Sequence, residues 1–299
     1  MGSHCQVPPE GVSEANLTRR VSEANLTRRV TVRTAAELHR HWSGPRNVLL
    51  AGDCVPFSYQ PPPVADIVDR LRRDEEVRLR DLSPERPDSS YYREDGFIDE
   101  FRALPLERVM EMPFGLSHFK LTNFTSRGDL FAGLWKDVME PWQAFLGRAG
   151  FTWYRCYPIV FISGAHVPGR YHMDVSHVVA WQIHGTKVFN GLLDPYRWAP
   201  LERAADPDWR TGMVRPEGLT AEDVLSYAMP PGTLLWNQLL TPHWVDAVDT
   251  VAGTSEVAGT SEVAASINLS HGGLRLEGEL SPAGQALERF YRERPERRF

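Results

Sequence analysis

The chain has 299 residues, of which 42% are hydrophobic and 24% are charged, and its formal net charge at pH 7 is −6. These values are typical of one large globular domain and exclude a mostly disordered chain, a collagen-like chain or a coiled coil. The acidic balance also weighs against nucleic acid as the main partner, because phosphate binding needs a basic surface.

The sequence contains no membrane or export signal that we can identify. No stretch approaches the roughly 18 apolar residues of a membrane span, and the N-terminus lacks the apolar segment of a signal peptide. The three cysteines, Cys5, Cys54 and Cys156, are odd in number and widely spaced. This usage fits a reduced compartment better than a disulfide framework, so we expect a cytoplasmic protein with no membrane contact.

Residues 1–30 are predicted to be a cloning remnant, beginning MGSH, and a mobile leader. Within this leader VSEANLTRR occurs at 12–20 and again at 21–29, and near the other end VAGTSE occurs at 251–256 and again at 257–262. A repeat architecture needs several diverged units of about 20 to 50 residues. These short identical copies do not meet that requirement, and we assign them no function.

Residues 31–150 are predicted to form a helical N-terminal part. A helix with one apolar face is expected from the i, i+3, i+4, i+7 spacing of Val64, Ile67, Val68 and Leu71. A shorter helix is expected at 97–104, and a longer one is expected to start at Ser126 and extend to Leu146. Pro141 should kink or divide this longer helix. The charged segment 74–95 is expected to be a solvated loop or a lid.

Residues 151–271 are predicted to form a β-rich core. Runs dense in aromatic and β-branched residues, separated by Gly and Pro, occur at 153–162, 178–183, 187–193, 233–236 and 264–269. Several short strands with such turns indicate an antiparallel sandwich or barrel. Residues 272–299 should form a C-terminal helix and tail whose thin apolar face is a candidate homodimer surface. We expect 31–299 to be a single domain.

The residues that point most strongly to chemistry are His172 and Asp174, in an H-x-D triplet. In a strand, residues two apart point to the same face, so the imidazole and the carboxylate would converge. His243, which follows a strand-like run and Pro242, is the best candidate for a third ligand. Two histidines and one carboxylate leave positions open on an Fe(II) ion. The alternative for an isolated H-x-D is a core histidine bonded to an aspartate.

Further segments follow the triplet in a fixed order. These are Q-x-x-G-x-K from Gln182 to Lys187, P-G-x-L-x-W from Pro231, P-H at His243, and a last strand that contains Asn268. Over residues 150–271 this frame resembles the Jumonji-C (JmjC), or cupin-like, branch of the Fe(II)/2-oxoglutarate oxygenases. The resemblance implies a mostly β fold with a double-stranded β-helix (jelly-roll) core, on which the helices of the N-terminal part pack.

The resemblance also implies roles for individual residues. His172, Asp174 and His243 would bind Fe(II). Lys187, fifteen residues after His172, would bind the distal carboxylate of 2-oxoglutarate. The cosubstrate would also contact Asn268 and a tyrosine of the strand that enters the barrel, for which Tyr157 and Tyr154 are both candidates.

The chain departs from the family pattern at two positions that often contact the cosubstrate. Val178 stands where the family often has Asn, and Gly169 stands where it often has Ser or Thr. Arg170 and Asn237 are candidates for the mouth of the substrate site, whereas the bland alternative for Lys187 is a surface lysine after a Gly185 turn.

By resemblance, the protein is expected to be a dioxygenase that consumes O₂ and 2-oxoglutarate and hydroxylates an unactivated C–H. Asp174 favours hydroxylation, because related halogenases have a small residue in its place. The substrate would be an amino acid, a peptide or a natural-product intermediate, or alternatively a side chain of a protein, as in the ribosomal-protein hydroxylases. The competing class is a non-oxygenase cupin that binds another metal and acts as an isomerase or a ligand-binding protein.

Overall fold

The computed structural model describes residues 28–55, 57–81, 95–164, 167–211, 213–247 and 263–297. Both tandem duplications, except Arg28 and Arg29, lie outside these residues, as does 82–94 in the expected lid. What we predicted for those segments stays a prediction, and so do the domain boundaries.

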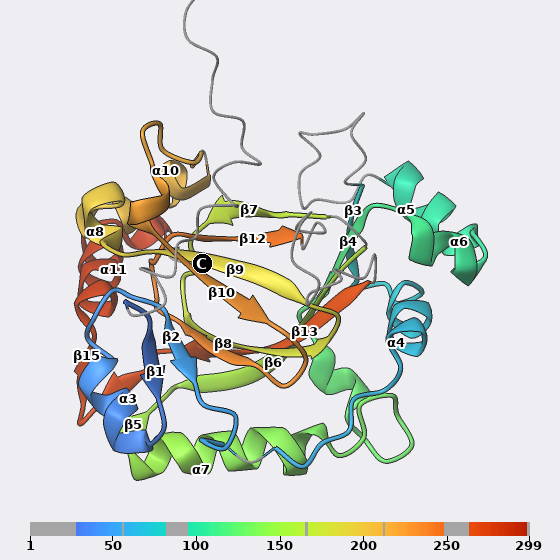
Figure 1. Cartoon of the computed structure of the whole chain (residues 1–299), viewed down its shortest axis with the longest axis horizontal. Helices are drawn as coiled ribbons and strands as arrows, with labels where there is room; N and C mark the ends of the chain where they lie inside the picture. Colours follow the sequence, from blue (N-terminus) through green and yellow to red (C-terminus); the bar gives the residue numbers. More distant parts are fainter. Residues whose placement is uncertain are drawn as a thin grey trace, which may run out of the picture.

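The described residues are mostly β-strand, with helices around them (Figure 1). A large sheet has the strand order β1-β2-β11-β8-β13-β6-β4-β3, and a smaller sheet has the order β10-β9-β12-β7. Neighbouring strands in both sheets are antiparallel, except for the parallel pair β1 and β2. The strands of the large sheet are β1 (Val30–Val32), β2 (Val48–Leu50), β3 (Arg78–Asp81), β4 (Phe114–His118), β6 (Arg155–Ser163), β8 (His177–His184), β11 (Leu234–Asn237) and β13 (Ala264–Gly272).

The smaller sheet packs face to face against the large one. Its strands are β7 (Gly169–His172), β9 (Lys187–Leu192), β10 (Val224–Met229) and β12 (His243–Ala247). One apolar cluster joins Ala180 and Leu235 of the large sheet to Phe189, Leu225 and Tyr227 of the smaller one. Because these residues come from both sheets, they define the inner faces of a two-layer core. A separate small sheet is formed by β5 (Phe151–Thr152), β14 (Arg275–Leu276) and β15 (Glu279–Leu280).

Helices cover the outer face of the large sheet. Figure 1 shows α7 (Glu140–Arg148) running along the sheets. Its Trp142 and Phe145 belong to the main apolar cluster. Burying a large apolar side chain contributes about 1.5–3 kcal/mol, so this cluster is a major source of stability. The other helices of the first half are α3 (Ala35–His41), α4 (Val64–Leu71), α5 (Asp95–Ala103) and α6 (Leu106–Glu111), with a 3₁₀ turn at Leu121–Phe124.

Short helices close one end of the two-sheet core. They are α8 (Pro195–Trp198), α9 (Leu201–Ala204), α10 (Pro207–Thr211) and α11 (Pro282–Glu293), with 3₁₀ turns at Ala221–Asp223 and Pro295–Arg297. The start of α11 follows from its sequence: Ser281 accepts a hydrogen bond from the Gly284 amide, and Pro282 occupies a position that needs no N–H donor. In the part of the chain that the structure describes, we find no helix long and apolar enough to span a membrane.

Most of the predicted elements are present. The structure confirms the helix at 64–71, the helix that begins at Pro282 and all five strand-like runs, with boundaries shifted by a few residues. The long helix expected from Ser126 is wrong over its first third. Gly128 and Gly133 have φ angles of +91° and +88°, a left-handed conformation that interrupts a right-handed helix. Regular structure therefore starts with a π-helical turn at Trp135–Met139 and continues as α7, with Pro141 in its first turn.

The N-terminal part also contributes strands that the sequence analysis did not anticipate. β1 and β2 extend the large sheet at one edge, and β4 and β3 extend it at the other. Within the expected solvated loop, Arg78–Asp81 is strand β3, where Leu79 and Arg80 are both buried. Charged residues flank a single leucine here, so the apolar alternation was too short to detect.

Candidate metal centre

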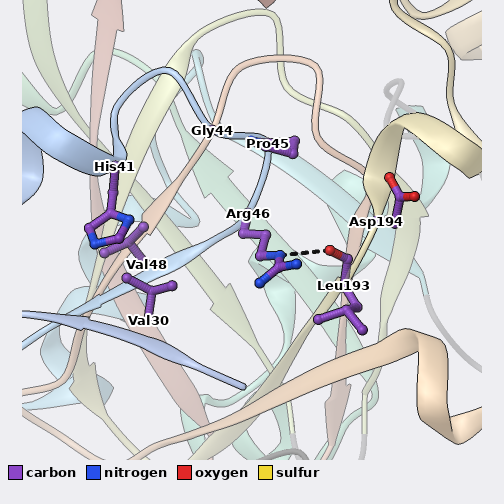
Figure 2. A pocket seen from close by; sticks show the side chains of 8 residues that line it. All are labelled: Val30, His41, Gly44, Pro45, Arg46, Val48, Leu193 and Asp194. Atoms are coloured by element: carbon purple, nitrogen blue, oxygen red, sulfur yellow. Dashed lines mark hydrogen bonds between the residues drawn. The ribbon is translucent and has the colours of Figure 1, made fainter. Parts of the chain in front are cut away.

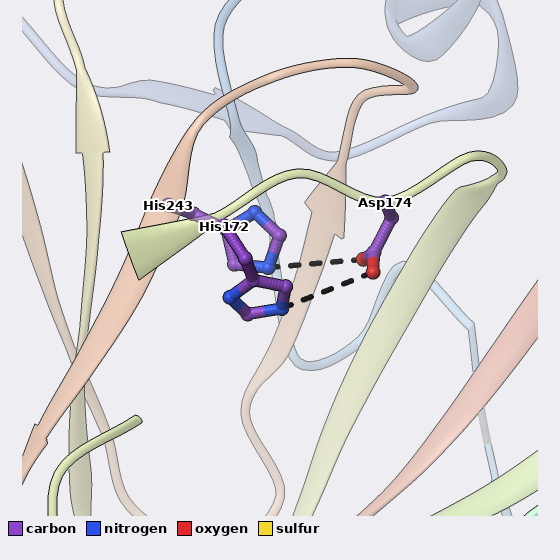
Figure 3. Close-up of side chains that lie close together, drawn as sticks. All are labelled: His172, Asp174 and His243. Atoms are coloured by element: carbon purple, nitrogen blue, oxygen red, sulfur yellow. Dashed lines mark ion pairs between the residues drawn. The ribbon is translucent and has the colours of Figure 1, made fainter. Parts of the chain in front are cut away.

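Three potential metal ligands converge at one end of the two-sheet core (Figure 3). His172 is the last residue of β7, His243 is the first of β12, and the two are direct neighbours in the strand pairing. Asp174 lies in the turn after β7, so it does not share a strand face with His172 as the sequence analysis assumed. One ligand atom from each residue lies within 4.8 Å of the others. The turn therefore brings together the side chains that strand periodicity was expected to align.

The carboxylate of Asp174 faces both imidazoles. Its Oδ1 is 3.9 Å from His172 Nε2, and its Oδ2 is 3.7 Å from His243 Nε2. The two histidine rings are 4.2 Å apart, centroid to centroid. The side chain of His172 is 46% exposed, that of Asp174 is 31% exposed and that of His243 is 5% exposed, so the cluster spans the boundary between solvent and the core.

Backbone carbonyls select the same tautomer for both histidines. His172 Nδ1 is 2.7 Å from the carbonyl oxygen of Arg170, and His243 Nδ1 is 3.0 Å from that of Thr241. A carbonyl oxygen only accepts, so each Nδ1 carries the hydrogen and each Nε2 keeps its lone pair. This is the arrangement of histidines that ligate metals through Nε2 while their second nitrogen is held by the protein.

Burial keeps His243 in the form that binds a metal. Removal from solvent, with a smaller contribution from neighbouring His172, lowers the pKa of His243 to about 4, and Asp174 opposes this shift. The ring is therefore neutral at pH 7. Its face stacks on Phe189 of β9, with ring centroids 5.0 Å apart and planes within 13° of parallel. The stacking leaves the imidazole little freedom to turn away from Asp174.

The loop that precedes His243 is tied to Asp174 by a strained residue. Leu240 has a φ angle of +56°, which a non-glycine residue rarely adopts. Its N–H donates to the carbonyl oxygen of Asp174 over 2.9 Å, and its fully buried side chain packs in a cluster with Ala283 and Phe290 of α11. The packing holds Leu240 in this conformation and so fixes the two ligand-bearing loops relative to each other.

The residues expected to bind the cosubstrate line the inner faces of the two sheets. His243 pairs with Gly191 on β9, and residues two apart share a face, so Lys187 lies on the same inner face as Phe189. Among the described residues, Lys187 has no hydrogen-bond or ion-pair partner. Burial lowers the pKa of its ammonium group to about 8. A half-buried cation without a counter-ion is a suitable place for an anion. The alternative, a surface lysine after the Gly185 turn, differs from this in that Lys187 is only partly exposed.

Asn268 and Tyr157 occupy the opposing inner face. Asn268 of β13 pairs with Ala180, which belongs to the cluster between the sheets, and with Ile159 of β6. Its Oδ1 is buried and finds no hydrogen-bond partner in the described part of the chain. Tyr157 is two residues before Ile159 and therefore shares this face. The other candidate, Tyr154, is 90% exposed and lies before β6 begins.

Two asparagines at the centre were missed or misplaced by the sequence analysis. Asn237, expected at the substrate mouth, is 2% exposed and touches both Asp174 and His243. Asn47, which hydrogen-bonds to Asn237, lies far outside the motif-bearing region. No local pattern marks Asn47, because its partner is 190 residues away in the chain.

A cavity of about 460 Å³ lies between residues of 30–48 and the residues that follow β9, not at the candidate metal ligands (Figure 2). It is lined by the polar side chains of His41, Arg46 and Asp194 and by the apolar side chains of Val30 and Val48, among others. Arg46 Nε donates to the carbonyl oxygen of Leu193 over 2.7 Å. None of the three candidate metal ligands lines this cavity, so it is separate from the centre described above.

No protein-family model matches the chain, and no curated protein matches it. Among solved structures it is similar to the ribosomal oxygenase YcfD of Escherichia coli, at 16% sequence identity and a TM-score of 0.45, covering 78% of this chain and 50% of that one. A YcfD structure with cobalt and 2-oxoglutarate matches at 15% identity over 78% of this chain and 50% of that one, with a TM-score of 0.46. A YcfD structure with cobalt and succinic acid matches at 15% identity over 88% of this chain and 57% of that one, with a TM-score of 0.46.

The chain thus spans about half the length of these YcfD structures. Because the identities and TM-scores are low, the function proposed below rests on the residues of the site.

Proposed function

We propose that the protein is an Fe(II)- and 2-oxoglutarate-dependent dioxygenase that hydroxylates an unactivated C–H bond. The observation that carries this proposal is the cluster of His172, Asp174 and His243, with both Nε2 lone pairs turned towards one carboxylate. Two imidazoles and one carboxylate are the ligand set of non-haem Fe(II) oxygenases, and they leave coordination positions open.

The strand arrangement supports a double-stranded β-helix core for this enzyme. From β6 to β13, successive strands belong to the large, small, large, small, small, large, small and large sheet. Eight strands that alternate in this way between two packed sheets are the arrangement of a jelly roll. In such a core β7 and β12 are neighbours at one end, which accounts for the pairing of the two histidine ligands.

The residues fit the proposed metal and cosubstrate on chemical grounds. Bound Fe(II) would supply the activation of O₂, with one oxygen atom going to the substrate as hydroxyl and the other to succinate as CO₂ leaves 2-oxoglutarate. His172, Asp174 and His243 would hold the metal. The Lys187 ammonium group would pair with the distal carboxylate of 2-oxoglutarate, and Asn268 and Tyr157 would contact the same molecule.

The unsatisfied groups on the inner faces favour an anionic ligand there. Lys187 lies four residues from Gly191, the strand partner of His243, which corresponds to about 13 Å along the strand. A dicarboxylate can span the space between the lysine and the metal ligands. Asn268 can donate through Nδ2 to a carboxylate, although its buried Oδ1 would still require a donor such as a hydroxyl group or water.

For the substrate we propose an amino acid, a peptide or a natural-product intermediate, with a protein side chain of the ribosomal type as the alternative. A non-oxygenase cupin that binds another metal is the remaining alternative for the whole protein. Lys187 argues against it, because a protein that only binds a ligand at the metal has no need of a half-buried cation on the inner face of β9.

The experiment that tests the proposal is an anaerobic titration of the Fe(II)-loaded protein with 2-oxoglutarate. A weak visible metal-to-ligand charge-transfer band should appear, and it should be absent in His172→Ala. Iron binding without the band would favour the other-cupin alternative, and failure to bind iron would return His172, Asp174 and His243 to a structural role. With the band established, succinate release in the presence of candidate substrates distinguishes a small molecule from a protein.

A further inference from the structure

Asn237, the last residue of β11, lies directly behind two of the candidate metal ligands. Its Nδ2 is 3.1 Å from Asp174 Oδ2, 3.1 Å from His243 Nδ1 and 3.5 Å from His243 Nε2. The side chain is 2% exposed. A buried amide in contact with a carboxylate and an imidazole can fix the position of both.

The hydrogen-bonding capacities of the neighbours determine how this amide is oriented. The Asp174 carboxylate accepts, so the nitrogen of Asn237 and not its oxygen must face it. His243 Nδ1 already donates to the carbonyl of Thr241, so Asn237 lies against the ring without donating to Nδ1. The Oδ1 of Asn237 therefore points away from both ligands and needs a donor of its own.

Asn47 supplies this donor from the N-terminal part of the chain. Its Nδ2 donates to Asn237 Oδ1 over 2.5 Å, and the side chain is completely buried. Space for it comes from Gly191 on β9, where a Cβ atom would overlap Asn47 Oδ1. The backbone carbonyl of Asn47 in turn accepts from the hydroxyl of Tyr227 over 3.1 Å. Each of these features restrains the amide of Asn47.

The segment 41–47 also holds the loop that leads to His243. Thr241 Oγ1 donates to the carbonyl of Pro45 over 2.9 Å, and Gln238 Nε2 donates to the carbonyl of His41 over 3.2 Å. Arg46 fastens the same segment to the end of β9 through Leu193 (Figure 2). Segment 41–47 is therefore hydrogen-bonded both to the loop that leads to His243 and to the residue that follows β9.

We infer that Asn47 and Asn237 are positioning residues for the metal: Asn47 orients Asn237, and Asn237 holds Asp174 and His243 in the geometry that binds a divalent cation. This inference rests on the metal-binding part of the proposed function and does not require 2-oxoglutarate turnover. It makes segment 41–47 part of the metal centre, although this segment lies about 100 residues before the motif-bearing region.

The test is a titration of the metal-free full-length protein with Co²⁺ alone, followed by the visible spectrum of the bound cobalt. Asn237→Ala and Asn47→Ala should each weaken cobalt binding by about 10- to 100-fold, the usual effect of removing an outer-shell partner of a metal ligand. The cobalt spectrum should also change, because the ligands are no longer held in one geometry. A side chain with a merely structural role would alter thermal stability but not the spectrum.

A double-mutant cycle tests whether the two amides act as a unit. If Asn47 acts only through Asn237, the double variant should bind cobalt about as weakly as Asn237→Ala alone. Gly191→Ala provides a second route to the same result, because its added methyl group displaces the Asn47 side chain while both amides remain. If the two losses of cobalt affinity add in the double variant, Asn47 does not act through Asn237.

Asn190→Ala is the matched control. Asn190 is also a buried asparagine (2% exposed), but its amide bonds to Ser226 and Asp246. Its loss should lower stability and leave cobalt affinity and spectrum unchanged. If folded Asn47→Ala, or folded Gly191→Ala where the former does not fold, binds cobalt like the wild type, Asn47 does not position the metal. If Asn237→Ala also binds normally, the whole inference fails.

The outcomes separate this inference from the proposed function. Wild-type protein that binds cobalt, with the predicted variant effects but without any 2-oxoglutarate-dependent band, would retain the positioning role and remove the oxygenase. A 2-oxoglutarate-dependent band together with unchanged cobalt binding in the variants would do the reverse. Wild-type protein that binds no cobalt would overturn the positioning role.

Discussion

His172 and His243 are direct neighbours across β7 and β12, with ring centroids 4.2 Å apart. Strand pairing brings their backbones together, whereas the position of Asp174 depends on a turn and on its contacts with Leu240 and Asn237. The backbones of the two candidate nitrogen ligands are thus placed by the sheet, whereas the candidate oxygen ligand is placed by a turn, by Leu240 and by Asn237 of β11.

Removing a ligand should abolish metal binding without unfolding the protein. His172→Ala and Asp174→Ala should each weaken cobalt binding by more than the about 10- to 100-fold typical of an outer-shell partner, and turnover should be lost. His172 is 46% exposed, so the melting temperature should hardly change. The matched control is His184→Ala, because His184 bonds to the carbonyl of Pro62 and lies outside the ligand cluster. Normal activity in either ligand variant would exclude the triad.

Lys187 should make cosubstrate binding sensitive to alkaline pH. Burial lowers the pKa of its ammonium group to about 8, so the free protein loses this charge as the pH rises through 8. Because 2-oxoglutarate binds the charged form, its KM should be lowest below pH 8 and should rise above it by up to about tenfold per pH unit. Lys187→Met should raise the KM and remove this pH dependence.

The control for this effect is Lys120→Met, because Lys120 is an exposed lysine paired with Glu76. Its KM profile should match that of the wild type. A cosubstrate KM in Lys187→Met equal to the wild-type value would remove Lys187 from the site.

Elements buried on both faces were predictable from the sequence, and short ones were not. β8 is buried along seven of its eight residues and has the continuous apolar run of a core strand. β7 and β12 carry the two candidate histidine ligands among glycine, arginine and aspartate residues, so no alternation identified them. The first part of the helix expected at 126–146 had a suitable apolar pattern, but two glycines in left-handed conformations prevented it.

The proximity of His172, Asp174 and His243 was predictable because they lie in or beside recognisable motifs. Their supporting contacts were not, because they join residues that are distant in the chain. The bond between Asn47 and Asn237 spans 190 positions, and the carbonyl groups that set the histidine tautomers carry no side-chain signature. Contacts of this kind depend on the finished fold, and residue spacing does not encode them.

Acid should destabilise the protein through two buried histidines, His177 and His271. Burial lowers their pKa values to about 3 and about 4, from 6.5, so both are neutral in the folded state. The unfolded chain binds more protons below pH 6.5, so their contribution is fully present above pH 6.5 and is lost as the pH falls towards 4. The slope is about 1.4 kcal/mol per pH unit for each histidine.

Urea unfolding at pH 7.5 and at pH 5 measures this loss. The NMR signals of the two imidazoles show whether these histidines cause the loss of stability. Trp142 donates to His271 Nε2 over 2.7 Å, and the Leu239 amide donates to His177 Nδ1 over 3.3 Å, so neither ring has a free site for a further proton. The two signals should stay constant between pH 8 and 5. Titration of either signal near pH 6.5 in the folded protein would contradict this account.

Asn268→Ala should impair cosubstrate binding while costing little stability. The buried Oδ1 of Asn268 has no partner among the described residues, so its removal relieves an unsatisfied acceptor worth about 1–3 kcal/mol, which offsets the lost packing. Asn190→Ala, in contrast, breaks the hydrogen bonds to Ser226 and Asp246 and should lower the melting temperature. In activity assays Asn268→Ala should be the more impaired of the two variants, because it should raise the KM for 2-oxoglutarate. Its cobalt affinity should be unchanged. An unchanged KM together with a large loss of stability would give Asn268 a structural role.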